Sequence, residues 1–201
     1  MTHEPTIHIV DDNEACLNML ANVVGAVYPR VKTYASAREF LASQQAAETG
    51  CLLLDVCMPD MDGFELHKEL KARGTILSVI FITAHGDIKM AVEAIKDGAH
   101  DFIEKPFKNR HLLALIRSGL AAARHNEIKA RLQTLTPRER EVLELVVGGE
   151  TNKGVARELG ISEKTVEIHR AHMITKMKAK TLAALVQMSL IAKTGITIEH
   201  R

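Results

Sequence analysis

The chain has 201 residues, of which 46% are hydrophobic and 25% are charged, and its formal net charge of +1 is ordinary for one large or two small globular domains. No run approaches the ~20 apolar residues of a membrane span, and the opening residues MTHEPTIHIV lack the pattern of a signal peptide, so we expect a cytoplasmic protein that does not enter a membrane. The three cysteines form an odd set without metal-type spacing, which also favours a reducing compartment.

Residues 1–125 alternate short β-type runs with helix-like segments. The β-type runs are IHIV (7–10), VKTY (31–34), CLLL (51–54), VIFI (79–82) and HDFI (100–103). The helix-like segments are 13–25, 36–47, 64–72, 87–97 and 108–124. Aliphatic runs of this kind suit a parallel sheet covered on both faces, so the pattern predicts a doubly wound α/β domain with right-handed crossovers.

From about residue 126 the β pattern stops and helices are predicted. Thr136-Pro137-Arg138-Glu139 combines an N-cap, a proline at the first helical position and the glutamate of a capping box. Further helices are predicted at 152–159, about 163–177 and about 181–192. Residues 1–125 carry 13 Lys and Arg against 16 Asp and Glu, whereas the remainder carries 13 against 9. A basic second half is compatible with a polyanionic partner, and equally with a neutral one.

Most of the β-type runs are followed by a residue with an acidic, basic or hydroxyl side chain. Asp11 and Asp12 follow the first run, Asp55 the third and Thr83 the fourth, and Lys105 lies one residue beyond the fifth. Sites in open parallel sheets form at the carboxyl ends of the strands, so these side chains are expected to converge. Clustered carboxylates repel one another unless a cation intervenes, and oxygen ligands of this kind suit Mg²⁺.

Acids, a magnesium ion and a free amine together indicate phosphoryl transfer. Asp55 would then be the nucleophile that forms an aspartyl phosphate, while Lys105 pairs with phosphoryl oxygens and Thr83 donates a hydrogen bond to one of them. Taken singly, an aspartate after a strand is more often a turn or a helix cap, and a Lys-Pro pair is more often a solvated loop. Four of the five predicted strands end in side chains of this kind, and this agreement favours a phosphoryl-transfer site over unrelated turns and caps.

The stretches IVDDNE, CLLLDVCMPDMDG, VIFITAHGD and DFIEKPF closely resemble, in order and separation, the receiver domain of two-component response regulators, from residue 6 to about 124. The resemblance implies a flavodoxin-like five-stranded fold with Asp55 as phosphoacceptor and Mg²⁺ as cofactor. The implied metal ligands are Asp11 (through water), Asp12, Asp55 and the backbone carbonyl of Cys57. Thr83 and Lys105 would be the switch hydroxyl and lysine. Phe102 would be the switch aromatic residue, acting only by packing because it has no hydroxyl.

NKGVARELG-IS-EKTVEIHRAHM has the helix, tight glycine turn and helix of a helix-turn-helix. Lys164, Glu167, Ile168 and Ala171 share one face of the second helix, and this face is short of apolar residues, as expected for a helix that enters a major groove. The alternative is an all-α interaction module whose charged face is only solvated.

The segment from LTPREREVLELVV to HRAHMITKM closely resembles the four-helix LuxR-type DNA-binding domain, and the chain as a whole resembles the FixJ/NarL family of response regulators. The expected domains are a receiver at 1–124, a linker at 125–134, left open between a rigid helix and a flexible segment, and an all-α DNA-binding domain at 135–201. The resemblance implies that 163–177 is the recognition helix and that 181–192 helps to pair two such domains.

Two sets of DNA contacts are expected from these positions. Base edges would be faced by Lys164, Glu167, Ile168 and Ala171, with the carboxylate able to accept from a cytosine amino group. Phosphates would be contacted by Asn152, Thr165, His169, Arg170 and Lys176. His169 can equally be a packed structural residue.

The implied function is transcription regulation. A sensor histidine kinase phosphorylates Asp55, and the protein then forms a homodimer through the surface around 87–118 and binds double-stranded promoter DNA, with RNA polymerase as a further candidate partner. The chain would not be an enzyme beyond self-phosphorylation and autodephosphorylation. A phosphohydrolase would want an acid where Cys57 stands, and a phosphate-independent receiver would not need the complete acidic set. A quorum-sensing LuxR regulator is excluded by the first half.

Overall fold

The computed structural model describes residues 5–43, 49–84 and 88–194. Internal contacts divide the chain into two compact units, Met1–Arg124 and His125–Arg201. Within the described ranges, no helix combines the length and the apolarity that a bilayer crossing requires.

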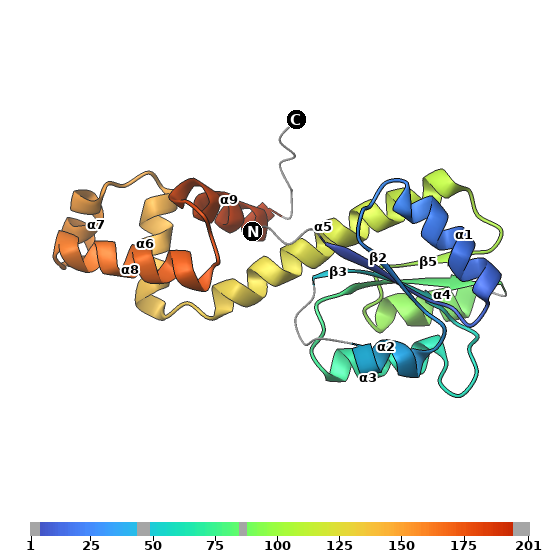
Figure 1. Ribbon diagram of the computed structural model, residues 1–201. Helices are drawn as coiled ribbons and strands as arrows, with labels where there is room; N and C mark the ends of the chain where they lie inside the picture. Colours follow the sequence, from blue (N-terminus) through green and yellow to red (C-terminus); the bar gives the residue numbers. More distant parts are fainter. Residues whose placement is uncertain (1–4, 44–48, 85–87, 195–201) are drawn as a thin grey trace. The chain divides into compact units, whose positions relative to one another are not determined.

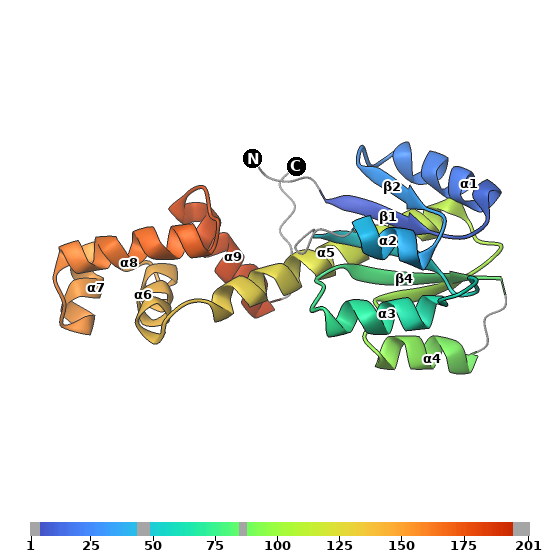
Figure 2. The same cartoon turned by 60° about the horizontal axis from the view of Figure 1, so that its bottom comes forward.

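The first unit is built on a five-stranded parallel sheet with the strand order β2-β1-β3-β4-β5 (Figures 1 and 2). The strands are β1 (Thr6–Val10), β2 (Val31–Tyr34), β3 (Gly50–Asp55), β4 (Ser78–Thr83) and β5 (Asp101–Glu104). The order reverses between β1 and β3, as in flavodoxin-like doubly wound sheets, whose ligands bind beyond the carboxyl ends of the strands at that point. The five predicted strands and the predicted fold class are confirmed.

Helices cover both faces of this sheet (Figure 2). They are α1 (Glu14–Gly25), α2 (Ala37–Ser43), α3 (Gly63–Ala72), α4 (Ile88–Lys96) and α5 (Asn109–Gln133). Because successive strand residues point to opposite faces, Leu52 and Leu54 of β3 pack in one core with α2, α3 and α4, whereas Leu53 packs in the other with α1 and α5.

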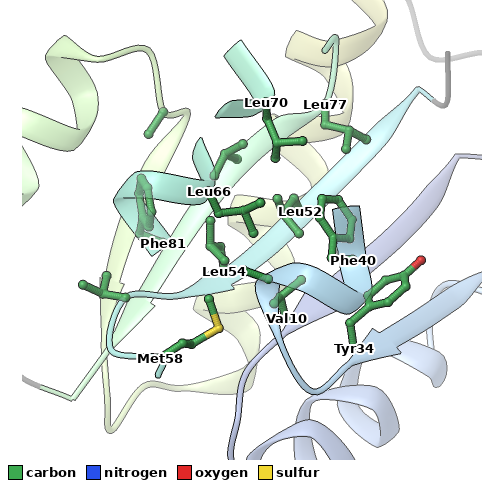
Figure 3. Packing of buried hydrophobic residues seen from close by; sticks show 14 of the residues in the cluster. Val10, Tyr34, Phe40, Leu52, Leu54, Met58, Leu66, Leu70, Leu77 and Phe81 are labelled. Atoms are coloured by element: carbon green, nitrogen blue, oxygen red, sulfur yellow. The ribbon is translucent and has the colours of Figure 1, made fainter. Parts of the chain in front are cut away.

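Figure 3 shows the first of these cores, in which Leu54 of β3 lies near Leu66 of α3 and Phe40 of α2 lies beside Leu52. All six residues of β3 are buried. Full burial of a leucine or phenylalanine side chain stabilises the fold by roughly 1.5–3 kcal/mol. The central strand is therefore firmly held, and Asp55 at its end stands on a rigid element.

The second unit is helical, as predicted. Its own helices are α6 (Pro137–Val147), α7 (Asn152–Leu159), α8 (Glu163–Lys176) and α9 (Leu182–Thr194). The side chains of Thr136, Thr151 and Ser162 accept hydrogen bonds from backbone N–H groups in the first turns of α6, α7 and α8. Gly160 adopts a left-handed conformation with φ of 65°, which allows the tight turn between α7 and α8.

Helix α5 is longer than the segment 108–124 predicted from the sequence, because it continues to Gln133. Most of the expected linker is thus helical in the structure. Ile128 is 1% exposed and belongs to the core of the second unit, and Arg131 donates to the carbonyl oxygen of Met177, the C-cap residue of α8, at 3.1 Å. This arginine places a positive charge at the negative end of α8.

Glu139 is a buried carboxylate that joins α6 to α8. It is 2% exposed, its Oε2 accepts from the backbone N–H of Thr136 at 2.8 Å, and Lys176 of α8 donates to the same oxygen at 2.7 Å. Burial alone would raise the pKa of Glu139, but the hydrogen bonds from Lys176 and Thr136 and the charge of Lys176 together outweigh burial, so the pKa lies below the ordinary value of 4.5. The carboxylate thus closes a capping box and positions α8 at once.

We predict that Glu139→Gln lowers the free energy of unfolding by roughly 1–3 kcal/mol at pH 7, because the variant leaves Lys176 facing an uncharged amide. A depressed folded-state pKa means that the charged carboxylate stabilises the fold above pH 4.5 and that this contribution is lost as pH falls through the folded-state pKa. The difference in unfolding free energy between wild type and variant, measured by urea unfolding from pH 7 down to below the folded-state pKa, should therefore shrink only at pH values below 4.5.

Glu141→Gln is the matched control, since this glutamate lies on the same helix in an exposed pair with Arg138. It should change the free energy of unfolding by less than ~0.5 kcal/mol. If the difference in unfolding free energy between wild type and Glu139→Gln did not change with pH, the charge of Glu139 could not be the source of the stabilisation.

Candidate functional site

Polar side chains gather at the carboxyl ends of four adjacent strands. Asp11 directly follows β1, Asp55 ends β3, Thr83 ends β4, and Lys105 directly follows β5. The sheet order places β3 between β1 and β4, with Leu54 opposite Val10 and Asp55 opposite Ile82. The backbone N–H of Lys105 also donates to the carbonyl oxygen of Thr83 at 2.7 Å, which fixes the start of the lysine loop against β4.

The ammonium group of Lys105 lies between two carboxylates. Its Nζ donates to Asp11 Oδ2 and to Asp55 Oδ1, both at 2.9 Å. Only 3% of the Asp11 side chain and 9% of the Asp55 side chain are exposed, against 24% of the lysine. Two buried acids thus share one amine, as the strand-end pattern predicts.

This arrangement shifts the pKa of both partners. Burial raises the pKa of the Asp55 carboxyl above its ordinary value, and the hydrogen bond and charge of Lys105 offset only part of that effect. Burial alone would lower the pKa of Lys105, but its hydrogen bonds to Asp55 and Asp11 outweigh burial and hold the pKa above the ordinary value. The lysine therefore carries a full charge at neutral pH.

The loop after β3 orients Asp55. The backbone N–H of Cys57 donates to Asp55 Oδ2 at 2.8 Å, and the N–H of Gly63 donates to the carbonyl oxygen of Val56 at 3.0 Å. A Cβ atom on Gly63 would lie 2.4 Å from the carbonyl oxygen of Asp55, so only glycine lets α3 begin this close to the site. Asp62 caps α3 with Glu65 in a reciprocal capping box.

The oxygen atoms present suit a magnesium ion. Asp11 Oδ1 accepts from the backbone N–H of Asn13 at 2.9 Å, and each of the four carboxylate oxygens of Asp11 and Asp55 keeps a lone pair beyond its hydrogen bond. Asp12 is exposed. Among the described residues, no three His, Cys, Asp or Glu side chains already surround one point. The fit rests on the oxygens of Asp11, Asp12 and Asp55 and the carbonyl of Cys57, a donor set typical of Mg²⁺.

Two further side chains bear on the proposed site, the predicted switch residue Phe102 and the cysteine Cys16. Phe102 on β5 is half-buried and packs against the core that contains α4. Cys16, which was not predicted as a site residue, interacts with Asp11 and Lys105, and burial followed by the Asp11 hydrogen bond raises the pKa of its thiol to about 11. The sequence signal for Cys16 was its place in the first turn of the helix that directly follows Asp11 and Asp12.

Helix α8 presents a distinct polar face in the second unit. Its buried residues are Val166 and Met173, followed by Met177 at the cap. The four residues predicted to face base edges, Lys164, Glu167, Ile168 and Ala171, are all exposed. An exposed face opposite a buried one is the arrangement that a recognition helix requires.

Four of the five residues predicted to contact phosphates have hydrogen-bond partners within the protein. The guanidinium group of Arg170 donates to the Asn152 side chain at the start of α7, and the Thr165 hydroxyl bonds that of Ser162 at 2.8 Å. Lys176 pairs with Glu139, and His169 is half-buried. These contacts hold the side chains at the edges of the exposed face rather than within it.

Basic residues of α7 were missed by the sequence analysis. Lys153 and Arg157 are exposed one turn apart and line an open hollow together with Glu150, Thr151 and Gly154. In helix-turn-helix proteins the first helix crosses the DNA backbone. Their spacing of four residues on a predicted helix was a signal that could have placed them.

Comparisons with known proteins cover both units. The family model described as "Response regulator receiver domain" matches residues 7–117, and the model "Bacterial regulatory proteins, luxR family" matches residues 133–189. The chain is 46% identical over 198 residues to the transcriptional regulatory protein FixJ of Rhizobium meliloti, covering 94% of this chain and 97% of that protein. It is 42% identical over 194 residues to FixJ of Azorhizobium caulinodans, covering 92% of each.

A solved structure is similar along nearly the whole chain. It is described as full-length FixJ from B. japonicum, with 38% identity, a TM-score of 0.57, and coverage of 96% of this chain and 98% of that one.

We predict that Lys105→Met lowers the free energy of unfolding by roughly 2–4 kcal/mol in the presence of a chelator, because two buried carboxylates lose their shared cation. Urea unfolding measures this loss. Added Mg²⁺ should restore more stability to the variant than it adds to the wild type, since the variant lacks the ammonium group that pairs with both acids.

Lys108→Met serves as the control, because Lys108 is an exposed lysine of the same loop. Its effect should stay within ~0.5 kcal/mol. Equal stability of Lys105→Met and Lys108→Met would show that Lys105 does not stabilise the acidic cluster.

Proposed function

The chain belongs to the response regulators that combine a receiver domain with a LuxR-type DNA-binding domain, and from this premise we propose that a sensor histidine kinase phosphorylates Asp55 in the cytoplasm. The phosphorylated protein then dimerises and binds promoter DNA. In this proposal residues 1–124 act as the receiver, residues 135–201 bind DNA, and residues 125–134 join them.

The observation that carries the proposal is the hydrogen bonding of Lys105 to both Asp11 and Asp55. A nucleophilic carboxylate needs a fixed position, and the packed strand β3 and the N–H of Cys57 supply it. An incoming phosphoryl group carries negative charge, and the Lys105 ammonium lies within hydrogen-bond distance of an Asp55 oxygen. Nucleophile and counter-charge therefore stand together before the phosphoryl group arrives.

In the proposed reaction a carboxylate oxygen of Asp55 attacks phosphorus, and the bond from phosphorus to the kinase histidine nitrogen breaks as the new O–P bond forms. The nitrogen leaves with the electron pair. Asp11, Asp12, Asp55 and the Cys57 carbonyl would hold Mg²⁺, which when bound neutralises charge on the phosphoryl oxygens. Lys105 would exchange its hydrogen bond with Asp55 for one with a phosphoryl oxygen.

The proposed switch begins at Thr83 and Lys105. The Thr83 hydroxyl would donate to the phosphoryl group, which draws the end of β4 inward. Phe102 lies beside the core that contains α4, so a movement of β4 leaves a space that this ring can fill. Shifting a two-state equilibrium from 1:99 to 99:1 needs ~5.5 kcal/mol. Charge-assisted contacts from Lys105, Thr83 and the metal ligands can supply an amount of this size.

The proposed dimer surface lies on α4. Val92 and Ile95 are exposed by 45% and 47% and stand three residues apart on this helix. Burial of these two aliphatic side chains against a second copy would remove apolar surface from water and so favour association. They fall inside the surface around 87–118 that the sequence analysis selected.

In the DNA-binding half, α8 would enter the major groove with Lys164, Glu167, Ile168 and Ala171 toward the bases. Asn152, Thr165, His169, Arg170 and Lys176 would lie beside the phosphates, and Lys153 and Arg157 of α7 would join them. Bound promoter DNA would bring the protein to RNA polymerase, the last partner in this proposal.

The competing functions fit less well. A phosphohydrolase with an aspartyl-phosphate intermediate would place a catalytic acid two residues after Asp55, where Cys57 offers only a backbone N–H to Asp55. A receiver that works without phosphate would have no need to bury two acids around one lysine. We therefore propose a phosphoacceptor with at most self-phosphorylation and autodephosphorylation chemistry.

We predict that beryllofluoride with Mg²⁺ converts the wild-type protein from monomer to dimer, and that Asp55→Asn abolishes this change because an amide is a poor ligand for the phosphoryl mimic. Light scattering or sedimentation reports the mass, which for one chain is 22.2 kDa.

Asp60→Asn is the matched control, since Asp60 is an exposed acid of the same loop and has a φ of 65° that asparagine tolerates. This variant should dimerise like the wild type. A mass shift in Asp55→Asn, or none in the wild type, would refute the link between phosphorylation of Asp55 and dimerisation.

We also predict that Arg170→Ala weakens binding to every duplex sequence and reduces the slope of log K against log salt by about 1, because one phosphate contact is lost. Fluorescence anisotropy over a range of salt concentrations measures the slope. Arg73→Ala removes an arginine that pairs with Glu69 in the receiver and should leave the slope unchanged. An unaltered slope in Arg170→Ala would remove this arginine from the phosphate contacts.

A further inference from the structure

Ile168 is an apolar side chain that α8 holds in solvent. It is 48% exposed and is the one large hydrophobic residue on the exposed face of this helix among the described residues. An isoleucine lowers helix propensity relative to lysine, glutamate or alanine, and leaving its aliphatic surface in water gains nothing for the fold. The unit already has a complete core on the opposite face of α8, around Val166 and Met173.

The surroundings of Ile168 restrict what can cover it. Its neighbours on the same face are the ammonium of Lys164, the carboxylate of Glu167 and the small side chain of Ala171, all exposed. A protein partner would need a contiguous apolar patch, and a single aliphatic group between two charges is too small for one. The partner that fits presents a small apolar group among hydrogen-bonding groups of both kinds.

The floor of the DNA major groove has this chemistry. Thymine alone among the four bases presents a methyl group there, beside donors and acceptors of the neighbouring bases. We infer that Ile168 recognises the C5-methyl group of a thymine and thereby determines sequence specificity at that position. The inference rests on the proposed function, since it requires α8 to enter the major groove.

The two neighbours of Ile168 support this assignment. Ala171 lies one turn further along and has only a methyl side chain, so the helix can approach the groove closely enough for Ile168 to reach a base. Glu167 carries a negative charge and can only accept hydrogen bonds, so it favours a base that offers an amino group. Neither residue competes with Ile168 for the methyl group.

The test uses the full-length protein with Mg²⁺ and beryllofluoride and a duplex that this protein selects from a random library. Each thymine of the selected duplex is replaced in turn by uracil, which removes only the C5-methyl group. Replacement of one particular thymine by uracil should lower the affinity of the wild type roughly fourfold for each α8 helix that contacts such a thymine. This is the effect expected for the loss of one buried methyl group. Ile168→Ala should bind the thymine and uracil forms of that duplex equally.

Control variants separate this role from general effects on binding. Ile168→Val keeps an aliphatic side chain and should retain part of the discrimination against uracil. Val27→Ala truncates a receiver residue that is also exposed, by 53%, and should discriminate as the wild type does. The affinity of Ile168→Ala for random duplexes should depend on salt as the affinity of the wild type does. This comparison shows whether the variant is folded and keeps its phosphate contacts.

The outcomes distinguish this inference from the proposed function. Enrichment of no duplex at all would refute DNA recognition itself. A selected site in which every uracil duplex binds as tightly as its thymine form would overturn the role of Ile168 while leaving DNA binding intact. A uracil penalty that persists in Ile168→Ala would assign the methyl contact to another residue and equally overturn the inference.

Discussion

The receiver unit depends on one electrostatic arrangement, the placement of the Lys105 ammonium between the carboxylates of Asp11 and Asp55. Charges buried this deeply are costly unless they are paired, and the pairing joins residues 94 and 50 positions apart in sequence. Only a parallel sheet brings the carboxyl ends of β1, β3 and β5 to one edge. The apolar cores on both faces fix those strands, so hydrophobic packing makes the charged cluster possible, and the cluster in turn selects the register of the strand ends.

The DNA-binding unit uses the same physics for a different purpose. Glu139 is as buried as the receiver acids, but it faces a single lysine, Lys176, and also closes a helix cap. The ammonium of Lys176 balances this carboxylate, whose other oxygen lies 3.9 Å from His172 Nδ1 of the same helix, so the contact fixes α8 in place. In the receiver two carboxylates share one lysine, and the excess negative charge favours the binding of a cation. The ratio of acids to amines therefore distinguishes the balanced contact of Glu139 from the unbalanced cluster in the receiver.

The strands, the acidic cluster and most helix starts could be predicted from the sequence, because the patterns that indicate them lie within short segments. Apolar runs gave the strands, side chains at their ends gave the acidic cluster, and caps such as Thr136 gave the helix starts. What escaped prediction depends on three-dimensional partners. The contact of Cys16 with Asp11, the pairing of Lys176 with a buried glutamate and the length of α5 follow from packing between segments, and no periodicity within one segment encodes them.

In the proposed complex with DNA, different side chains of α8 would determine affinity and sequence specificity. Lys164 and Glu167 have opposite charges, so the face that would meet the bases adds little net attraction for a polyanion. In the proposed complex, attraction would come from basic groups at its edges, such as Arg170, which Asn152 orients, and the exposed Lys153 and Arg157 of α7. Affinity can then change with salt while the pattern of preferred bases stays constant, because phosphate contacts screen with ionic strength and the apolar and hydrogen-bonding contacts to base edges do not.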